Sequence, residues 1–117
     1  MFRKLDIWKD SVDLIKVIYL LANKLPKDEE YNLKSQLKRA VVSISLNIAE
    51  GKCRASAKDF AHFLNTASAS LYEVDAILVI CNELGYINNI EDYTSKTNVL
   101  NKKINSLRNK LMESSNV

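Results

Sequence analysis

Apolar residues recur along the chain at steps of three and four, the spacing that places side chains on one face of an α-helix. The pattern predicts four helices, at about residues 6–25, 29–51, 56–85 and 89–114. Pro26, Gly51 and Gly85 end the first three, the glycines as C′ residues, and Asp6 and Ser56 are predicted N-caps. No segment alternates apolar and polar residues as strands do. We therefore expect one all-α domain over residues 1–117, an up-and-down antiparallel four-helix bundle.

The third predicted helix is apolar on two faces. One face, with Phe60, Leu64, Leu71 and Leu78, is typical of a bundle core. The opposite stripe consists of small and apolar residues: Ala61, Ala69, Tyr72, Ala76, Val79 and Ile80. A helix that is apolar on two faces must be buried on two faces. We favour a homo-oligomer, in which another copy covers the second stripe; an irregular bundle with a wide core is the alternative.

The second predicted helix carries a polar stripe. A helical wheel places its members within an arc of about 80°; they are Gln36, Arg39, Ser43, Asn47, Glu50 and Arg54. Amide, hydroxyl, guanidinium and carboxylate groups can satisfy one another, so we expect a structural polar network, joined by Glu73 of the third helix. The alternative is a ligand site in which the Glu50 carboxylate lies between the guanidinium groups of Arg39 and Arg54.

Composition is that of a small globular domain, with 47% hydrophobic and 26% charged residues. The net charge of +3 does not by itself indicate nucleic-acid binding. Charge is uneven, however: residues 34–58 contain six bases and one acid, whereas residues 59–85 contain four acids and no Lys or Arg. The weak candidates for nucleic-acid contact are Lys34, Lys38, Lys52, Lys58, Lys102 and Lys103. A solvated helix face explains them equally well.

The chain lacks the residue combinations of common catalytic sites. His62 is the single histidine, which excludes a multi-His metal site and the paired Glu-x-x-His motifs of a di-iron bundle. A Gly-rich phosphate loop and a Gly-x-Ser-x-Gly turn are also missing. Cys53 and Cys81 lack metal-type spacing and are interpreted as buried thiols of a reducing cytosol. We expect no enzymatic activity, cofactor, metal or small-molecule substrate.

Membrane insertion is not expected either. No apolar run approaches the roughly 18 residues of a membrane span, and the N-terminus lacks a signal region. The predicted location is the cytoplasm.

Several motifs together are specific to one family. The most specific is Asn47-Ile48-Ala49-Glu50-Gly51, which follows Ser35-Gln36-Leu37-Lys38-Arg39-Ala40 and precedes Arg54. Further motifs are Phe2-Arg3-Lys4-Leu5-Asp6-Ile7-Trp8, Phe60-x-x-Phe63-Leu64 and Leu84-Gly85-Tyr86-Ile87. Over nearly its whole length the chain resembles the four-helix-bundle family of bacterial rRNA intervening-sequence proteins.

The resemblance implies a ring-shaped homopentamer of four-helix bundles, and most family members have no established biochemical activity. A related branch, the retroelement accessory variability proteins, works with a reverse transcriptase and nucleic acid. Our first expectation is a non-enzymatic homo-oligomeric scaffold whose partners are its own copies and RNA or a nucleic-acid-processing protein. The alternative is a nucleic-acid-binding accessory protein that works with a reverse transcriptase or an RNA-processing partner.

Overall fold

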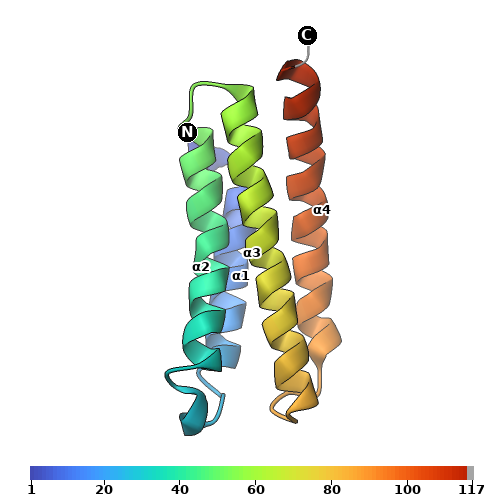
Figure 1. The fold of residues 1–117 in the computed structure, drawn as a ribbon. Helices are drawn as coiled ribbons and strands as arrows, with labels where there is room; N and C mark the ends of the chain where they lie inside the picture. Colours follow the sequence, from blue (N-terminus) through green and yellow to red (C-terminus); the bar gives the residue numbers. More distant parts are fainter. Residues whose placement is uncertain (116–117) are drawn as a thin grey trace.

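The computed structural model describes residues 1–115, which form four long α-helices and two short 3₁₀ helices (Figure 1). The elements are η1 (Phe2–Lys4), α1 (Asp6–Ala22), η2 (Lys27–Glu29), α2 (Leu33–Lys52), α3 (Ala57–Glu83) and α4 (Ile90–Ser115). Consecutive α-helices run in opposite directions and are joined by short connections. No strand occurs among the described residues, so the expected all-α fold is confirmed.

Two predicted helix limits near Pro26 are wrong. α1 ends at Ala22, three residues before the predicted end, and α2 begins at Leu33, four residues after its predicted start. Proline disfavours helical geometry in the residue before it, and the residues that follow it form the 3₁₀ turn η2. Asp6 is the first residue of α1 and not its N-cap, which is Leu5. Its carboxylate nevertheless lies at the positive end of the helix, where it is favourable.

Gly51 is not a C′ residue, because α2 continues through it to Lys52. It is buried where α2 meets the start of α3. A Cβ atom at this position would lie 2.7 Å from Cβ of Phe63 and 2.9 Å from Cδ1 of Phe60. Glycine is therefore needed here for close packing of the two helices.

The N-cap and the glycine-ended C-terminus that were predicted for the third helix, α3, both form. The amide of Asp59 donates to Oγ of Ser56 at 3.0 Å, which caps the N-terminus. Gly85 has φ of +78°, and the amide of Tyr86 donates to the carbonyl of Cys81 at 2.9 Å. These contacts make a Schellman motif with glycine at C′.

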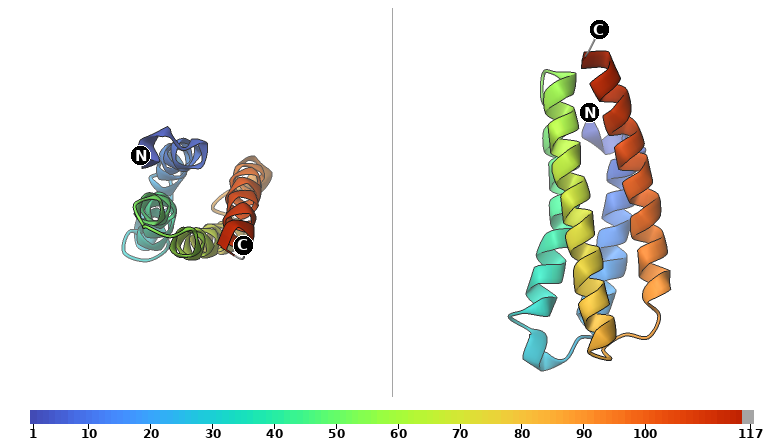
Figure 2. Two further views of the ribbon diagram at one scale, coloured as in Figure 1. Left: turned by 90° about the horizontal axis from the view of Figure 1, so that it is seen from above. Right: turned by 45° about the vertical axis from the view of Figure 1, so that its right-hand side comes forward.

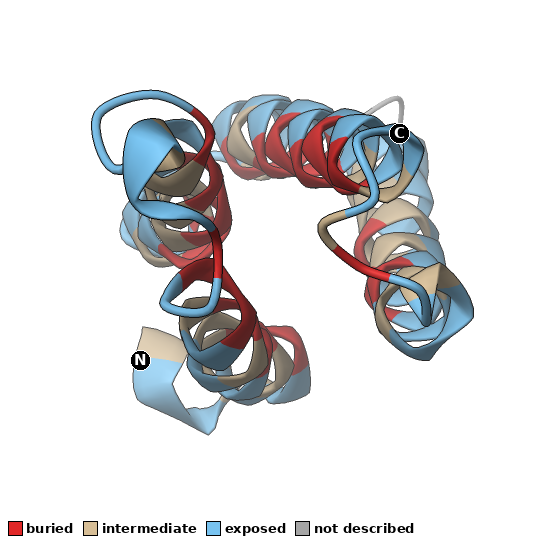
Figure 3. Ribbon diagram, turned by 90° about the horizontal axis from the view of Figure 1, so that it is seen from below, coloured by how far each residue is buried: buried red, intermediate tan, exposed pale blue. Residues whose placement is uncertain are grey.

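Seen along its axis, the bundle is a U (Figures 2 and 3). α2 and α3 form the base, α1 stands beside α2, α4 stands beside α3, and the open side lies between α1 and α4. Buried residues line the inside of the U. The largest fully buried side chains include Ile18, Leu37, Ile44, Ile48, Leu64, Leu71, Leu78 and Ile104. The outer faces of α2 and α3 are thus left to solvent in the single chain.

α3 is the one described helix long and apolar enough to cross a membrane by length and composition. Its apolar residues do not form one continuous run, because Ser, Asn and Thr interrupt them. Leu64, Leu71 and Leu78 of α3 are buried in the core that it forms with the neighbouring helices. A core helix of a soluble bundle has the same composition, and this packing favours that interpretation.

Candidate functional site

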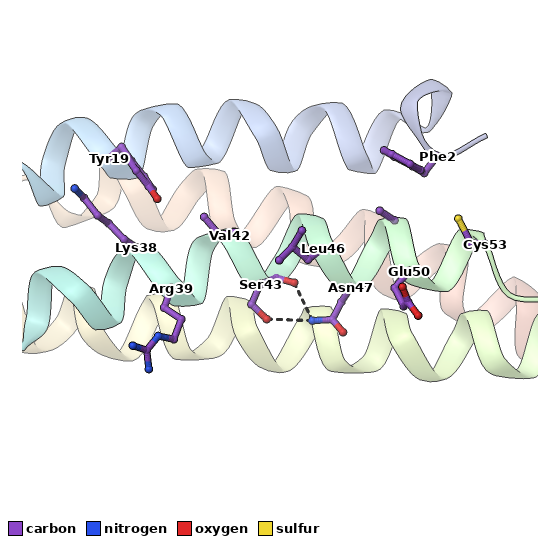
Figure 4. Close-up of a pocket in the computed structure, with 11 residues that line it drawn as sticks. Phe2, Tyr19, Lys38, Arg39, Val42, Ser43, Leu46, Asn47, Glu50 and Cys53 are labelled. Carbon is purple, nitrogen blue, oxygen red and sulfur yellow. Dashed lines mark hydrogen bonds between the residues drawn. The ribbon is translucent and has the colours of Figure 1, made fainter.

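A groove with a volume of about 840 Å³ runs along the outer face of α2 (Figure 4). Phe2 of η1 and Tyr19 of α1 form one wall, and the remaining lining residues come from α2 and the residue after it. Those residues are Lys38, Arg39, Val42, Ser43, Leu46, Asn47, Ala49, Glu50 and Cys53. Leu46 lies in the middle of the groove and is 62% exposed. We call this surface the α2 groove.

The polar stripe predicted on α2 lies partly in this groove. Nδ2 of Asn47 donates to the carbonyl of Ser43 at 2.8 Å and to its Oγ at 3.0 Å (Figure 4). Oγ of Ser70 on α3 donates to Oγ of Ser43 at 3.0 Å, which links the two helices. This group of three residues is half-buried or buried. It is the part of the stripe that supports the packing of α2 on α3.

The other members of the stripe form separate pairs, so the prediction of one network is wrong. Nε2 of Gln36 donates to Oδ1 of Asn32 at 2.9 Å, and Nη2 of Arg54 lies 2.5 Å from Oε1 of Glu50. Among residues 1–115, neither Arg39 nor Glu73 has a hydrogen bond or ion pair through its side chain. Arg39 is eleven residues from Glu50, which is about 16 Å along a helix and beyond side-chain reach. A carboxylate between two guanidinium groups does not form.

Substitutions should separate the two kinds of contact. We expect Asn47→Ala to lower the free energy of unfolding by about 1 kcal/mol, because it removes the two hydrogen bonds that the half-buried Asn47 amide donates to Ser43. Glu50→Ala removes a pair whose side chains are 55% and 45% exposed, for a loss within about 0.5 kcal/mol. Urea denaturation at one protein concentration measures both. Equal losses in the two variants would contradict this division of the stripe.

Five of the six residues of the predicted outer stripe of α3 are exposed: Ala69, Tyr72, Ala76, Val79 and Ile80. Tyr72 is 62% exposed, Val79 48% and Ile80 45%, which is high for side chains of this size. Ala61 is 2% exposed, so its assignment to this stripe is wrong. It lies two helical turns before Ser68, whose Oγ donates to Oδ1 of Asn101, and therefore on the flank of α3 that faces α4. We call the five exposed residues the α3 stripe.

The six lysines proposed for nucleic-acid contact do not form one patch. Lys34 pairs with Glu30 at 3.0 Å, and Lys103 pairs across the bundle with Asp10 at 2.8 Å. The Nζ atoms of Lys38 and Lys52 lie 4.8 Å and 5.8 Å from the centroids of aromatic rings, those of Tyr19 and Phe60. Lys58 and Lys102 are exposed. The ion pair with Asp10 raises the pKa of Lys103.

The two cysteines differ in environment. Cys81 is buried, and burial raises the pKa of its thiol. Cys53 is exposed at the end of the α2 groove, so the expectation of two buried thiols is wrong for it. Residues 1–115 contain no group of three or more His, Cys, Asp and Glu side chains placed to hold a metal ion.

A partly buried carboxylate lies between α3 and α4, where the sequence indicated nothing unusual. Oγ1 of Thr97, which is 1% exposed, donates to Oδ1 of Asp75 at 2.6 Å. Burial raises the pKa of Asp75, and the hydrogen bond from Thr97 opposes that effect only in part.

This carboxylate should make stability depend on pH. The pKa of Asp75 is raised in the folded state. Its contribution to the free energy of unfolding is therefore most favourable below the ordinary pKa of about 3.9 and is lost as pH rises. Asp75→Asn keeps an acceptor for Thr97 and stays neutral. We expect the melting temperature of this variant, relative to the wild type, to increase between about pH 3 and pH 7. A difference that falls or stays constant over this range would contradict the assignment.

Comparison with known proteins agrees with the motifs and the fold. The family model described as 23S rRNA-intervening sequence protein matches residues 3–111. A crystal structure of a protein with unknown function from the S23 ribosomal protein family of Bacteroides thetaiotaomicron has a similar fold, with a TM-score of 0.81. The two chains are 24% identical, and the match covers 88% of this chain and 95% of the other, which shows a common fold. No curated protein gave a match. The match over nearly the whole chain confirms the resemblance: the chain belongs to the 23S rRNA-intervening sequence protein family.

Proposed function

We propose that the protein is a non-enzymatic, homo-oligomeric helical scaffold of the cytoplasm. The observation that carries this proposal is the α3 stripe, which leaves Tyr72, Val79 and Ile80 exposed to solvent beside small alanines. A contiguous apolar face of this kind favours a protein interface. Among residues 1–115 nothing covers this face, so another copy is the simplest partner.

The α2 groove is the surface that fits the α3 stripe. The stripe protrudes from a helix, whereas the groove is hollow and has Val42 and Leu46 along its middle. The stripe lies on α3 and the groove lies on α2 beside α1, so they are two different patches of one chain. A contact between two different patches repeats from copy to copy, and it closes into a ring when the rotation permits. The family resemblance leads us to expect five copies.

Charge also favours this contact. Lys38 and Arg39 line the α2 groove, and Arg39 has no ion-pair partner among the described residues. Glu73 and Glu83 are exposed on α3, in the segment 59–85 that contains no Lys or Arg. Opposite charges across an interface speed association and select the correct partner. We infer that an acidic side chain of α3 in one copy faces Arg39 of the next.

The mass of the protein in solution tests the proposal. Light scattering at micromolar concentration should give a multiple of the 13.3 kDa chain mass, with five copies expected. A monomer at that concentration would overturn the scaffold, and a dimer would exclude a ring. The variants described in the Discussion test the two surfaces separately.

RNA binding is a second candidate, favoured by basic residues at one end of the bundle. Figure 1 shows that the N-terminus, the α2–α3 connection and the end of α4 lie at this end. Its exposed cations include Arg3, Lys4, Lys52, Arg54, Lys58 and Lys110. An oligomer would repeat them, and repeated weak phosphate contacts add.

Binding of a structured RNA hairpin at increasing salt measures this candidate. We expect affinity to fall steeply between about 0.05 and 0.2 M salt, and the double variant Lys52→Glu/Lys58→Glu to reduce the salt slope by about two. Lys27→Glu, at the opposite end, is the matched control. Absent binding near 0.1 M salt would exclude RNA as a direct partner.

A further inference from the structure

The open side of the bundle carries a second groove, formed by α1 and α4. Its volume is about 380 Å³. It is lined by Asp10, Asp13, Leu14 and Val17 of α1 and by Ser95, Lys96, Val99, Leu100 and Lys103 of α4. Figures 2 and 3 show these helices as the two arms of the U. We call this surface the α1–α4 groove; it shares no lining residue with the α2 groove.

The floor of the α1–α4 groove is apolar. Leu14 and Leu100 are 4% and 3% exposed and belong to the core. Val17 is partly exposed, and Val99 is 54% exposed. An aliphatic side chain that entered the groove would therefore contact both the core and an exposed valine, and would remove that valine from water.

The two rims of this groove have opposite charge. Asp10 and Asp13 lie on the α1 side, and Lys96 and Lys103 lie on the α4 side. The ion pair between Asp10 and Lys103, at 2.8 Å, joins the rims at one end. Asp13 and Lys96 are exposed, and neither has an ion-pair partner within residues 1–115. A ligand at this open end meets a free carboxylate on one side and a free ammonium group on the other.

We propose that the α1–α4 groove binds an amphipathic helix of a partner protein. The lining of α4 runs from Ser95 to Lys103, about 12 Å or two helical turns, which matches apolar side chains at positions i, i+3 or i+4, and i+7. The bound helix carries Lys or Arg on the flank that faces Asp13 and Asp or Glu on the flank that faces Lys96. This inference does not depend on the oligomer proposed above.

Other occupants fit this groove less well. A nucleic acid would bring phosphates against the two aspartates of the α1 rim. A second copy placed face to face would set one groove against another and leave both hollow. A helix with an apolar ridge and flanks of opposite charge satisfies the floor and both rims.

The test uses three labelled helical peptides of about 18 residues, with the same leucine ridge and different flanks. One has a basic and an acidic flank, the second has two basic flanks, and the third has two acidic flanks. Fluorescence anisotropy with the wild-type protein should show the mixed peptide binding at least about tenfold more tightly than either other peptide. No binding of the mixed peptide at about 100 µM would overturn the proposal.

Protein variants then locate the binding. Val99→Glu should weaken binding of the mixed peptide at least about tenfold. Lys96→Glu makes the free positions of both rims acidic, so it should shift the preference to the peptide with two basic flanks. Lys102→Glu is the matched control, since Lys102 is exposed on α4 outside the groove, and it should leave the preference unchanged.

Each contrary result has a clear meaning. Mixed-peptide binding that is indifferent to Val99→Glu and Lys96→Glu would place the peptide elsewhere and overturn the proposal. A lower oligomer mass of Val99→Glu in light scattering would show that this groove is an interface between copies instead. Unchanged circular dichroism of the variants confirms that they are folded.

Discussion

Leu46→Glu and Ile80→Glu are each expected to be monomers, and an equimolar mixture of the two is expected to form a one-to-one dimer. In the proposed contact, Leu46 lies in the α2 groove and Ile80 lies on the α3 stripe. A glutamate in either surface places an unpaired carboxylate in an apolar interface. At a cost of about 3 kcal/mol, typical of a central interface residue, association weakens by about 100-fold.

The mixture distinguishes a ring from a symmetric dimer. The Leu46→Glu chain keeps an intact α3 stripe, and the Ile80→Glu chain keeps an intact α2 groove. Those two surfaces can form one contact, after which both free ends are blocked. Light scattering of the mixture should therefore give twice the 13.3 kDa chain mass. If each patch bound its own symmetry-related copy, each single variant would keep one such contact and remain a dimer, and mixing the variants would not change the mass.

Leu20→Glu provides the control for these variants. Leu20 is 68% exposed on α1 and lines neither groove. The substitution adds the same charge to a comparably exposed leucine, so its assembly should match that of the wild type. A monomeric Leu20→Glu would show that net charge, and not the proposed interface, controls the mass.

Gly51→Ala is expected to lower the free energy of unfolding by about 1–3 kcal/mol, although alanine is the better helix former. In an exposed helix the same change would stabilise by up to about 1 kcal/mol. Here the added methyl would lie 2.7 Å from Cβ of Phe63 and 2.9 Å from Cδ1 of Phe60. Because Cβ of Phe63 is fixed to the backbone of α3, the helices must move apart. Urea denaturation of the variant and the wild type measures the loss.

A second substitution separates close packing from backbone strain. Gly85→Ala meets no atom within 4 Å but must adopt φ of +78°, which costs roughly 1 kcal/mol for a residue with a side chain. Adding Phe60→Leu to Gly51→Ala should recover part of its loss, whereas Phe60→Leu should not help Gly85→Ala. A Gly51→Ala protein as stable as the wild type would show that the helices are not held at this distance.

The sequence predicted the features that depend on neighbours along the chain. Helix spacing, the Ser56 cap and the Gly85 end involve residues within a few positions of one another, and the structure contains all three. The role of Gly51 does not follow from its neighbours along the chain. A glycine near a predicted helix end fits a C′ position, yet here it serves the contact with Phe60 and Phe63, which no local pattern reveals.

The polar stripe of α2 could be predicted less well than the α3 stripe, for a similar reason. A helical wheel shows which residues share a face but omits the rise of about 1.5 Å per residue that separates them along the axis, and it says nothing of the neighbouring helix. Arg39 and Glu50 share a face and are too distant to interact, whereas Ser70 of the neighbouring helix reaches Ser43. The α3 stripe could be predicted almost completely, since exposure depends mainly on which direction along the helix faces the core. Ala61 was the exception, because α4 covers that flank.

By itself, the sequence determined the four helices, the excess of apolar surface on the third and the motifs of the family. These properties follow from periodicity and capping, which are local. Only the tertiary structure decided that the bundle opens between α1 and α4, and that the apolar floor and the charged rims meet there. Asp13 and Lys96 are 83 residues apart in the chain. The register between the first and last helices brings them to one groove, and that register is set by packing of the whole core.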